Sequence, residues 1–227
     1  MARSIRARLG VTFAAMIELG LKFTIAYLLG SVLGSLVVGY LKGGVDIRRL
    51  GSGNPGGTNA FRTQGKWFAL WVMVIDVGKG LIAAAWLPGL SIPGIGLDPA
   101  VSRELVLYAV AFGAILGHCF PVWFDFRGGK GAATAAGLLI FLDPALGAAA
   151  VAVWIGVVAL TGYVGLATMT ASVLAFVLAG ALRLPEEQGF VLFAVCVAAL
   201  IVFTHRGNIR RMLNRTEPRF GRAAGGK

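Results

Sequence analysis

A polar, glycine-rich segment interrupts an otherwise apolar chain at residues 50–62, which read LGSGNPGGTNAFR. Its glycines can adopt positive φ angles and bring backbone N–H groups together around an anion. Its Ser, Thr and Asn side chains add neutral donors, and its arginine adds a guanidinium fork that suits phosphate. A flexible linker is the alternative, but a linker would not combine this many Asn, Thr and Arg residues. The residues that we expect to bind phosphate here are Ser52, Gly53, Asn54, Gly56, Thr58, Asn59 and Arg62.

A second glycine-rich segment reads Gly-Gly-Lys-Gly at residues 128–131 and precedes an apolar run at 132–142. A glycine loop that opens a helix favours anions through its free N–H groups and the helix dipole. It is not a Walker A loop, since that pattern requires Ser or Thr at position 131 and Gly at position 124, where this chain has Gly and Phe. The segment therefore predicts phosphate binding without ATP hydrolysis. The expected contacts are Gly128, Gly129, Lys130 and Gly131.

A third polar segment, rich in arginine, follows the last apolar run at residue 205. If the helix continues there, His205 and Asn208 share one face, because residues three apart are neighbours on a helix. Arg206 adds a cation beside them. A basic tail that anchors the chain to anionic lipid is an equally good explanation of this segment. We nevertheless include His205, Arg206 and Asn208 among the candidate phosphate ligands.

Two ionisable residues, Asp76 and Lys79, lie inside an apolar run. Each such residue costs about 2.5–3.5 kcal/mol to place in a membrane. They are three apart on a helix, so they can pair with one another, and a purely structural pair is one interpretation. Because a helix that only spans the bilayer would omit both, we expect a role near the site and include Lys79 among the phosphate ligands.

The metal-binding residue types are sparse in this sequence. The two histidines, His118 and His205, both fall in the polar segments, but neither has a second His or Glu at zinc-protease spacing. The two cysteines, Cys119 and Cys196, form no CxxC pair. We therefore expect neither a metal site nor a cofactor.

The composition indicates what must position these segments. Of the 227 residues 57% are hydrophobic and only 14% are charged, whereas soluble domains are about 45–50% apolar and about 25% charged. This excludes an ordinary soluble fold, and disorder requires the opposite composition. The net charge of +11 would suit nucleic acid, but the charges lie between long apolar runs, so we expect no nucleic-acid partner. The chain is predicted to be an all-α polytopic membrane protein.

Seven apolar segments are predicted to be transmembrane helices, two of them short. They lie at 19–41, 67–87, 104–117, 132–142, 144–160, 163–182 and 188–204. With alternating loops, one face carries 14 Lys and Arg residues and the other carries 5. The more basic face should be cytoplasmic, which puts the N-terminus outside and the C-terminus inside. The predicted organisation is an N-terminal tail at 1–18, one transmembrane domain at 19–204 and a basic cytoplasmic tail at 205–227.

Four blocks in order carry a family resemblance. They are Ser52-Gly-Asn-Pro-Gly-Gly-Thr-Asn59 with Arg62, Asp76-x-x-Lys79-Gly80, Gly117-His118 through Gly-Gly-Lys130-Gly to Thr134, and His205-Arg-x-Asn208-Ile209. Together they resemble the bacterial membrane-integral acyl-phosphate:glycerol-3-phosphate acyltransferases, over about residues 20–217. The resemblance implies seven helices in the bacterial inner membrane and an active site on the cytoplasmic side.

The resemblance also implies a reaction, the first step of phospholipid synthesis. A fatty acyl group would pass from acyl phosphate to the 1-hydroxyl of sn-glycerol 3-phosphate, giving lysophosphatidic acid and phosphate. The catalytic candidates are His118, His205 and Lys130. A general base would come from either histidine or from a substrate phosphate, and we favour little base catalysis by the protein, with His205 binding phosphate. A transporter of an anionic phosphorylated metabolite is the competing class, and neither class determines the oligomeric state.

Overall fold

The computed structural model describes residues 13–99 and 101–221, and the regular elements in this part of the chain are all helices. This confirms the all-α prediction. In chain order they are α2 (Phe13–Gly30), α3 (Gly34–Leu41), η1 (Ile47–Arg49), α4 (Gly57–Gln64), α5 (Lys66–Trp86), α6 (Arg103–Cys119), η2 (Val122–Phe124), α7 (Ala132–Leu142), α8 (Pro144–Thr161), α9 (Val164–Arg183), α10 (Gln188–Thr204) and α11 (Arg206–Leu213).

Five of the described helices, α2, α5, α6, α8 and α9, are long and apolar enough to cross a membrane. The α10–α11 pair passes the same test together but is bent by 51° where the two helices meet, and it could form a sixth span. Helix α7 is apolar but has only 11 residues. The protein is thus a multi-pass helical membrane protein, and helix length and composition support five or six of the seven predicted spans.

The first predicted span, residues 19–41, is two helices rather than one, because the chain turns between α2 and α3. The turn places its backbone against charged side chains of α5. The Lys79 ammonium donates to the Val32 carbonyl at 2.7 Å, and the Gly34 N–H donates to Asp76 Oδ1 at 3.1 Å. Backbone that leaves a helix at membrane depth needs such partners. The Asp76–Lys79 pair therefore stabilises this break.

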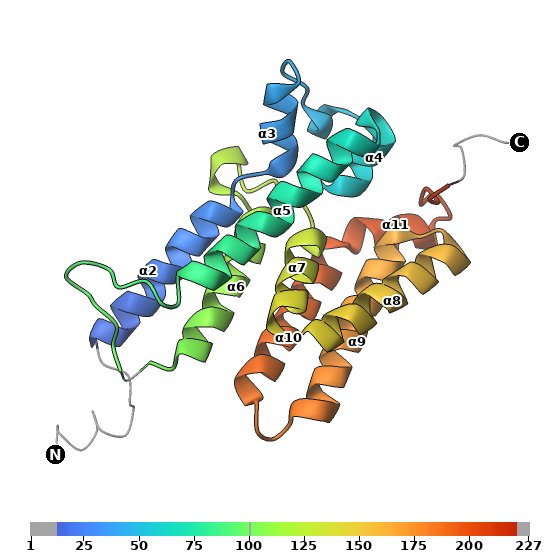
Figure 1. Ribbon diagram of the computed structural model, residues 1–227. Coiled ribbons are helices and arrows are strands. Elements are labelled where there is room, and N and C mark those ends of the chain that lie inside the picture. Colours follow the sequence, from blue (N-terminus) through green and yellow to red (C-terminus); the bar gives the residue numbers. More distant parts are fainter. Residues whose placement is uncertain (1–12, 100, 222–227) are drawn as a thin grey trace, which may run out of the picture.

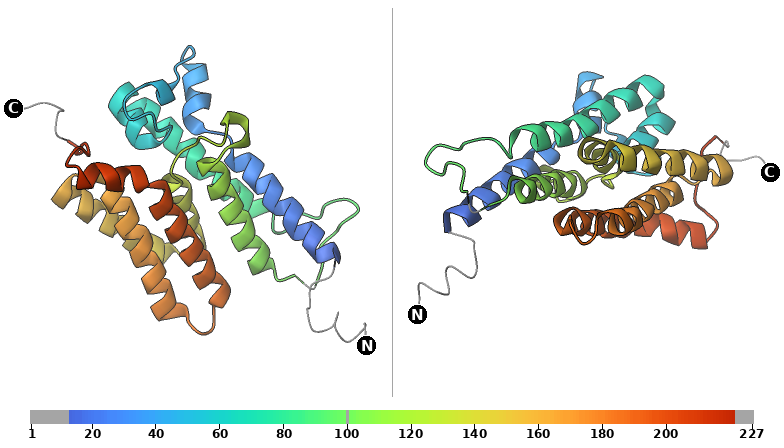
Figure 2. Two further views of the ribbon diagram at one scale, coloured as in Figure 1. Left: turned by 180° about the vertical axis from the view of Figure 1, so that it is seen from behind. Right: turned by 60° about the horizontal axis from the view of Figure 1, so that its bottom comes forward.

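The helices form two groups that meet along α7. Helices α2, α5 and α6 pack together, helices α8, α9 and α10 pack together, and α7 contacts both α5 and α8. Figure 1 shows α2, α5 and α6 to the left of α7, α8 and α9 to its right and α10 below it, and the left view of Figure 2 shows the two groups from behind. Helix α10 also contacts α6 directly. Helices α3, α4 and α11 lie at one end of the molecule, and the loop between α5 and α6 lies at the other end (Figure 1).

Glycine allows the closest helix approach in the first group. A Cβ atom on Gly30 of α2 would lie 2.2 Å from the Ala114 carbonyl oxygen, and one on Gly117 of α6 would lie 2.1 Å from the Tyr27 carbonyl oxygen. Membrane helices pack through such small residues because apolar burial does not drive their association in lipid. Part of the high glycine content, 33 of 227 residues, is explained by this contact.

A buried ionic cluster lies at the end opposite α4 and α11. Glu18 and Lys22 of α2 are both fully buried and pair at 2.7 Å, and Arg103 donates to the same carboxylate. Lys22 also donates to the Pro88 carbonyl, and the Asp98 N–H donates to Glu18 Oε2 at 2.8 Å. The cluster therefore holds the α5–α6 loop against α2.

Candidate active site

A cavity of about 360 Å³ lies between the two helix groups, with a polar end and an apolar end. Its polar lining residues are Ser52, Asn54, Thr58, Asn59, Arg62, Asp76, His118, Lys130, Thr168, Ser172, His205, Asn208, Arg211 and Glu217. Its apolar lining residues come from α7 to α10 and include Leu139, Ala150, Val151, Trp154, Ala175, Phe193 and Val197. All three polar segments singled out from the sequence therefore meet at one site.

The first glycine-rich segment is folded by one asparagine. Asn59 is buried, and its Nδ2 donates to the carbonyls of Ile47 and Leu50 at 3.0 Å each, while its Oδ1 accepts from the Ser52 N–H at 3.0 Å. These contacts occupy most of the hydrogen-bonding capacity of the Asn59 side-chain amide, so Asn59 holds the loop in shape. Ser52 lines the cavity together with Asn54, Gly56, Thr58 and Arg62; Gly53 does not.

The second glycine-rich segment contributes its lysine to the cavity, while its glycines pack against α6. Gly128 N–H donates to the Cys119 carbonyl at 3.1 Å, and Gly129 N–H donates to the His118 carbonyl at 3.0 Å. A Cβ atom on Gly128 would lie 2.2 Å from the His118 carbonyl oxygen. Gly131 has a φ of +82° and is the N-cap of α7. The three glycines do not line the cavity, and they allow the close approach of the loop that positions Lys130.

Lys130 begins a polar chain that links the second and third segments. Its ammonium donates to Asn208 Oδ1, and Asn208 Nδ2 donates to Glu217 Oε1 at 2.6 Å. Glu217 Oε2 accepts from Arg211 Nε at 2.7 Å. Burial, followed by the positive charges of Arg211 and Arg62, lowers the pKa of Lys130 from 10.5 to about 8. A half-buried, hydrogen-bonded cation that lacks a direct carboxylate partner is well suited to a phosphate.

Arg206 lies apart from this chain. It is exposed, its guanidinium lies 4.5 Å from the centre of the Phe203 ring, and it donates to the Phe203 carbonyl at 3.1 Å. It does not line the cavity, whereas Arg211 does. Sequence reasoning missed Arg211, although its position three residues after Asn208 puts both on one face of α11.

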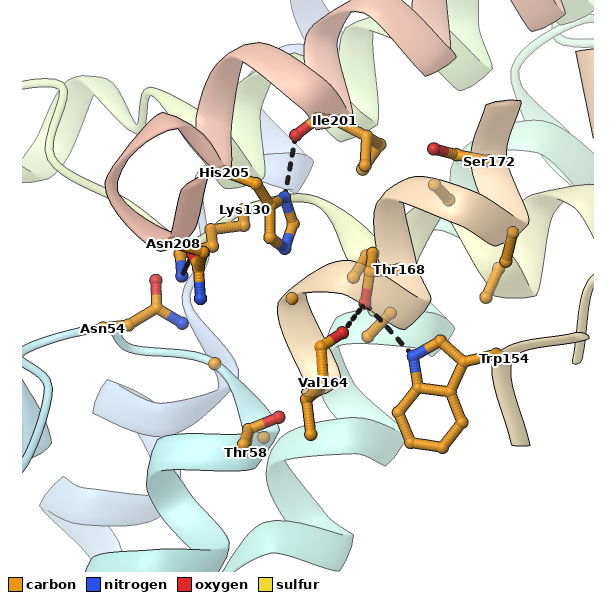
Figure 3. Close-up of a pocket in the computed structure, with 18 of the residues that line it drawn as sticks. Asn54, Thr58, Lys130, Trp154, Val164, Thr168, Ser172, Ile201, His205 and Asn208 are labelled. Carbon is orange, nitrogen blue, oxygen red and sulfur yellow. Dashed lines mark hydrogen bonds between the residues drawn. The ribbon is translucent and has the colours of Figure 1, made fainter. Parts of the chain in front are cut away.

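The two histidines present different atoms to the cavity. His205 Nδ1 lies 2.7 Å from the Ile201 carbonyl oxygen and must donate to it, so Nε2 of the neutral ring is an acceptor. Figure 3 shows this second nitrogen pointing into the open space near Lys130 and Thr168. His118 Nδ1 lies 2.9 Å from the Lys79 ammonium, which has no lone pair, so this Nδ1 accepts and Nε2 carries the proton. His118 therefore carries its donor at Nε2, which packs against Gly129.

Asp76, Lys79 and His118 form a buried cluster behind the polar end. The three N–H bonds of Lys79 are directed to Val32 O, Asp76 Oδ1 and His118 Nδ1, at 2.7, 3.0 and 2.9 Å. Lys79 does not line the cavity, whereas Asp76 and His118 do. Its donors are already used within the chain, so the structure places Lys79 behind the site and leaves none of its N–H bonds for a phosphate.

Residues 214–221 follow α11 and form a strap at the polar end of the cavity. Within the strap, Glu217 and Pro218 line the cavity, and the Phe220 N–H donates to the Gly162 carbonyl at 2.7 Å. The Phe220 ring lies 5.6 Å from the Phe61 ring of α4. The strap thus joins α4 to the α8–α9 turn. The sequence indicated only a basic tail here, and the one available signal was an acidic residue, Glu217, within it.

The apolar end is a deep channel between α7, α8, α9 and α10. His205 lies at its polar end, and Phe193 lies three turns earlier on α10, about 18 Å away at 1.5 Å per residue. Trp154 of α8 lines the channel, and its Nε1 donates to Thr168 Oγ1 of α9 at 3.1 Å (Figure 3). Small side chains such as Ala150 and Ala175 leave the space open. The channel has the shape and polarity to hold an alkyl chain.

The comparisons with known proteins agree with this arrangement. The family model described as glycerol-3-phosphate acyltransferase matches residues 21–215. A glycerol-3-phosphate acyltransferase of Bacillus cereus (strain G9842) is 39% identical over 207 residues, which cover 90% of this chain and 96% of the relative. One from Aquifex aeolicus (strain VF5) is 38% identical over 195 residues, which cover 86% and 95%.

Solved structures give the same result. The crystal structure of PlsY, an integral membrane glycerol 3-phosphate acyltransferase in its glycerol 3-phosphate form, superimposes with a TM-score of 0.76 and 35% identity, covering 89% of this chain and 96% of PlsY. Its lysophosphatidic acid form gives a TM-score of 0.74 and the same identity. The polar segments, the helix arrangement and the sequence similarity over most of the chain therefore agree, and this protein belongs to the membrane-integral glycerol-3-phosphate acyltransferase family.

Proposed function

We propose that this protein transfers a fatty acyl group from acyl phosphate to the 1-hydroxyl of sn-glycerol 3-phosphate. The observation that carries the proposal is the single cavity with cations at one end and an alkyl-sized channel at the other. The products would be lysophosphatidic acid and phosphate, and the reaction would begin phospholipid synthesis. The family membership supports the acceptor and the reaction type.

The charges at the polar end favour acyl phosphate as the donor. Lys130, Arg62 and Arg211 all line this end, and two phosphorylated substrates require several positive charges. Phosphate stabilised by these cations is a good leaving group, so positioning and electrostatics can carry the reaction. Cys119 does not line the cavity, which supports direct transfer rather than a thioester intermediate.

The transfer step is a simple substitution at the acyl carbon. The hydroxyl oxygen of glycerol 3-phosphate bonds to that carbon, and the bond from the carbon to the phosphate oxygen breaks with its electron pair on phosphate. The hydroxyl proton ends on the departing phosphate. His118 donates from Nε2 to a phosphate oxygen, and neutral His205 accepts from a P–O–H or substrate hydroxyl at Nε2. Lys130 neutralises the charge that grows on the leaving group.

The orientation in the membrane belongs to the same proposal. Helices α3, α4 and α11 would face the cytoplasm of the bacterial inner membrane, because the polar end carries most of the Lys and Arg residues. Helix α7 would be the short crossing that brings the count to seven. The N-terminus would then lie outside and residues 205–227 inside, as the charge distribution predicts.

One assay tests the donor and the acceptor together. The purified protein in phospholipid vesicles receives palmitoyl phosphate or palmitoyl-CoA with glycerol 3-phosphate, and released phosphate and lysophosphatidic acid are measured. We expect both products from palmitoyl phosphate and little transfer from palmitoyl-CoA. Transfer from palmitoyl-CoA alone would overturn the donor assignment, and no transfer from either would overturn the enzymatic function in favour of transport.

The histidine roles are tested by kinetics on single variants. For His205→Ala and His118→Ala, kcat and KM are measured separately for each substrate. A phosphate ligand that binds the substrate and the transition state equally raises KM with little change in kcat. A large fall in kcat alone for His205→Ala would instead identify it as a base.

A further inference from the structure

One carboxylate oxygen at the cavity lacks a partner. Asp76 is fully buried and lines the cavity, and its Oδ2 has no hydrogen-bond partner among the described residues. Its other oxygen, Oδ1, is surrounded by the Gly34 N–H at 3.1 Å, the Lys79 ammonium at 3.0 Å and His118 Nδ1 at 3.4 Å. A buried polar atom without a partner costs about 1–3 kcal/mol, so such an atom in a cavity suggests that a ligand pairs with it.

The surrounding contacts fix the position of this carboxylate. The backbone carbonyl of Asp76 accepts a hydrogen bond from Thr134 Oγ1 of α7 at 2.8 Å. One turn earlier on α5, Met73 packs against Gly57 of α4 so closely that a Cβ atom on Gly57 would lie 2.7 Å from Met73 Sδ. One turn later, a Cβ on Gly80 would lie 2.9 Å from Thr134 Cγ2. Asp76 therefore lies between the first glycine-rich segment and the first turn of α7, at the boundary between the polar and apolar ends.

The other polar groups at this end do not supply a free carboxylate. Both oxygens of Glu217 are occupied by Asn208 and Arg211. Lys130 and Arg62 are donors, and His118 presents an N–H. These groups match phosphate oxygens, whereas a hydroxyl group needs an acceptor for its hydrogen. The negative charge of Asp76 also repels phosphate, so a phosphorylated alcohol would turn its hydroxyl end toward Asp76.

We infer that Asp76 Oδ2 accepts a hydrogen bond from a hydroxyl group of the acyl acceptor and so orients it at the boundary where transfer occurs. Lys79 and the Gly34 N–H hold the carboxylate through Oδ1, and His118 Nδ1 accepts from the same Lys79 ammonium, so Lys79 is a positioning residue. The inference rests on the proposed function, because it takes glycerol 3-phosphate as the acceptor. No proton transfer to Asp76 is involved; the carboxylate positions the hydroxyl.

The test compares Asp76→Asn with the wild type in phospholipid vesicles. Asn keeps the size but replaces the charged acceptor, and at Oδ2 it can present N–H instead. We expect kcat/KM for glycerol 3-phosphate to fall about ten- to a hundredfold, as for loss of a hydrogen bond to a charged group, while KM for palmitoyl phosphate is unchanged. The matched control is Glu18→Gln, which neutralises a buried, ion-paired carboxylate at the opposite end; its kcat/KM should match the wild type.

A second acceptor, 3-hydroxypropyl phosphate, lacks the 2-hydroxyl and identifies which hydroxyl is bound. If Asp76→Asn lowers kcat/KM equally for both acceptors, the contact is with the attacking hydroxyl. If it lowers kcat/KM for glycerol 3-phosphate alone, the contact is with the 2-hydroxyl. An unchanged kcat/KM with both acceptors would overturn the inference. So would a matching rise in KM for palmitoyl phosphate, since that would indicate a merely structural role.

Folding of the variant is controlled separately. If Asp76→Asn does not fold, Asp76→Glu is used instead, because it keeps a negative charge beside Lys79 but moves the carboxylate. The same fall in kcat/KM for glycerol 3-phosphate is expected. Wild-type kcat/KM in folded Asp76→Glu would then overturn the inference. The wild type is measured alongside: transfer by the wild type with no effect of either variant defeats this inference alone, whereas no transfer by the wild type defeats the proposed function.

Discussion

At the scale of single residues, the polar end separates cations that face the cavity from cations that do not. Lys130, Arg62 and Arg211 line it, whereas Lys79 and Arg206 are held elsewhere by neighbouring groups. A positive charge near the site is therefore not sufficient evidence for a phosphate ligand. What distinguishes Lys130 is that it is partly buried and has an amide, not a carboxylate, as its direct partner.

The first prediction concerns these cations. Lys130→Ala and Arg62→Ala should each reduce acyl transfer at least a hundredfold, because each removes a charge that stabilises phosphate in a partly desolvated site. The measurement is the initial rate of phosphate release by purified protein in vesicles. Arg49→Ala is the control, since this exposed arginine lies in η1 near the same end but does not line the cavity. Full activity in either site variant would remove that residue from the proposed site.

The second prediction is a pH dependence that follows from Lys130. Its pKa is lowered to about 8, and the protonated form is the one that binds phosphate. The charged fraction is therefore complete near pH 6.5 and is lost as the pH rises through 8. We expect kcat/KM, which reports groups of the free enzyme, to fall between pH 7 and pH 9.5.

A single variant separates this effect from other titrations. Lys130→Arg keeps the positive charge over the whole range, because arginine stays protonated. Whatever activity it retains should lose the decline centred near pH 8. If kcat/KM of Lys130→Arg falls by the same factor and with the same midpoint pH as in the wild type, another group causes the decline.

At the scale of elements, the strap at residues 214–221 completes the site. Glu217 is nearly buried, with 5% of its side chain exposed, and it contacts both Asn208 and Arg211 of α11. It therefore fixes the orientation of the amide whose oxygen accepts from Lys130. A residue at the end of the described chain thus acts on a lysine in the loop before α7.

The third prediction tests this link. Glu217→Gln should raise KM for the phosphorylated substrates about tenfold, because Asn208 and Arg211 lose a charged acceptor worth about 1.5–3 kcal/mol. Substrate titrations with the purified variant measure it, and the melting temperature reports any general loss of stability. Glu186→Gln makes the same change at an exposed position outside the cavity. An unchanged KM in folded Glu217→Gln would show that the strap does not position Asn208.

At the scale of the whole molecule, the active site lies between two helix groups rather than within either one. The first group contributes α5 and the end of α6, together with α4, which packs on α5. The second contributes α8, α9 and α10, together with α11, and α7 lies between the groups. In the proposed reaction the phosphates and the alkyl chain would bind along this one cavity, with the reacting carbon where the polar and apolar linings meet.

The fourth prediction concerns the deep end of the channel. Ala150 lines it and is only partly buried, so Ala150→Leu should fit without repacking the fold and should fill part of the channel. We expect activity with palmitoyl phosphate to fall more than activity with a shorter acyl phosphate such as lauroyl phosphate. Ala148→Leu is the matched control, because Ala148 is exposed on the same helix. An equal response of both chain lengths would place the acyl chain elsewhere.

Much of this description could be predicted from the sequence. The high apolar content forces helices in a membrane, because a backbone in lipid must satisfy its own hydrogen bonds. The three polar segments were identified from residue types alone, and the cavity lining includes Ser52, Asn54, Thr58, Lys130, His205 and Asn208 from them. Local composition is informative here because polar residues are costly in an apolar chain, so a segment that concentrates them is expected to have a role.

The tertiary structure decided how individual groups are used. Gly128, Gly129, Asn59 and Lys79 have the types expected of phosphate ligands, but their hydrogen-bonding groups are directed to partners within the chain. Arg211 and Glu217 line the cavity although no sequence motif singled them out, and Asp76, expected only near the site, lines the cavity directly. A residue type determines which hydrogen bonds are available, whereas the packing of distant segments determines which are already made. For that reason the sequence by itself determined the membrane class and the segments of the site, and only the tertiary structure decided which atoms face the substrate.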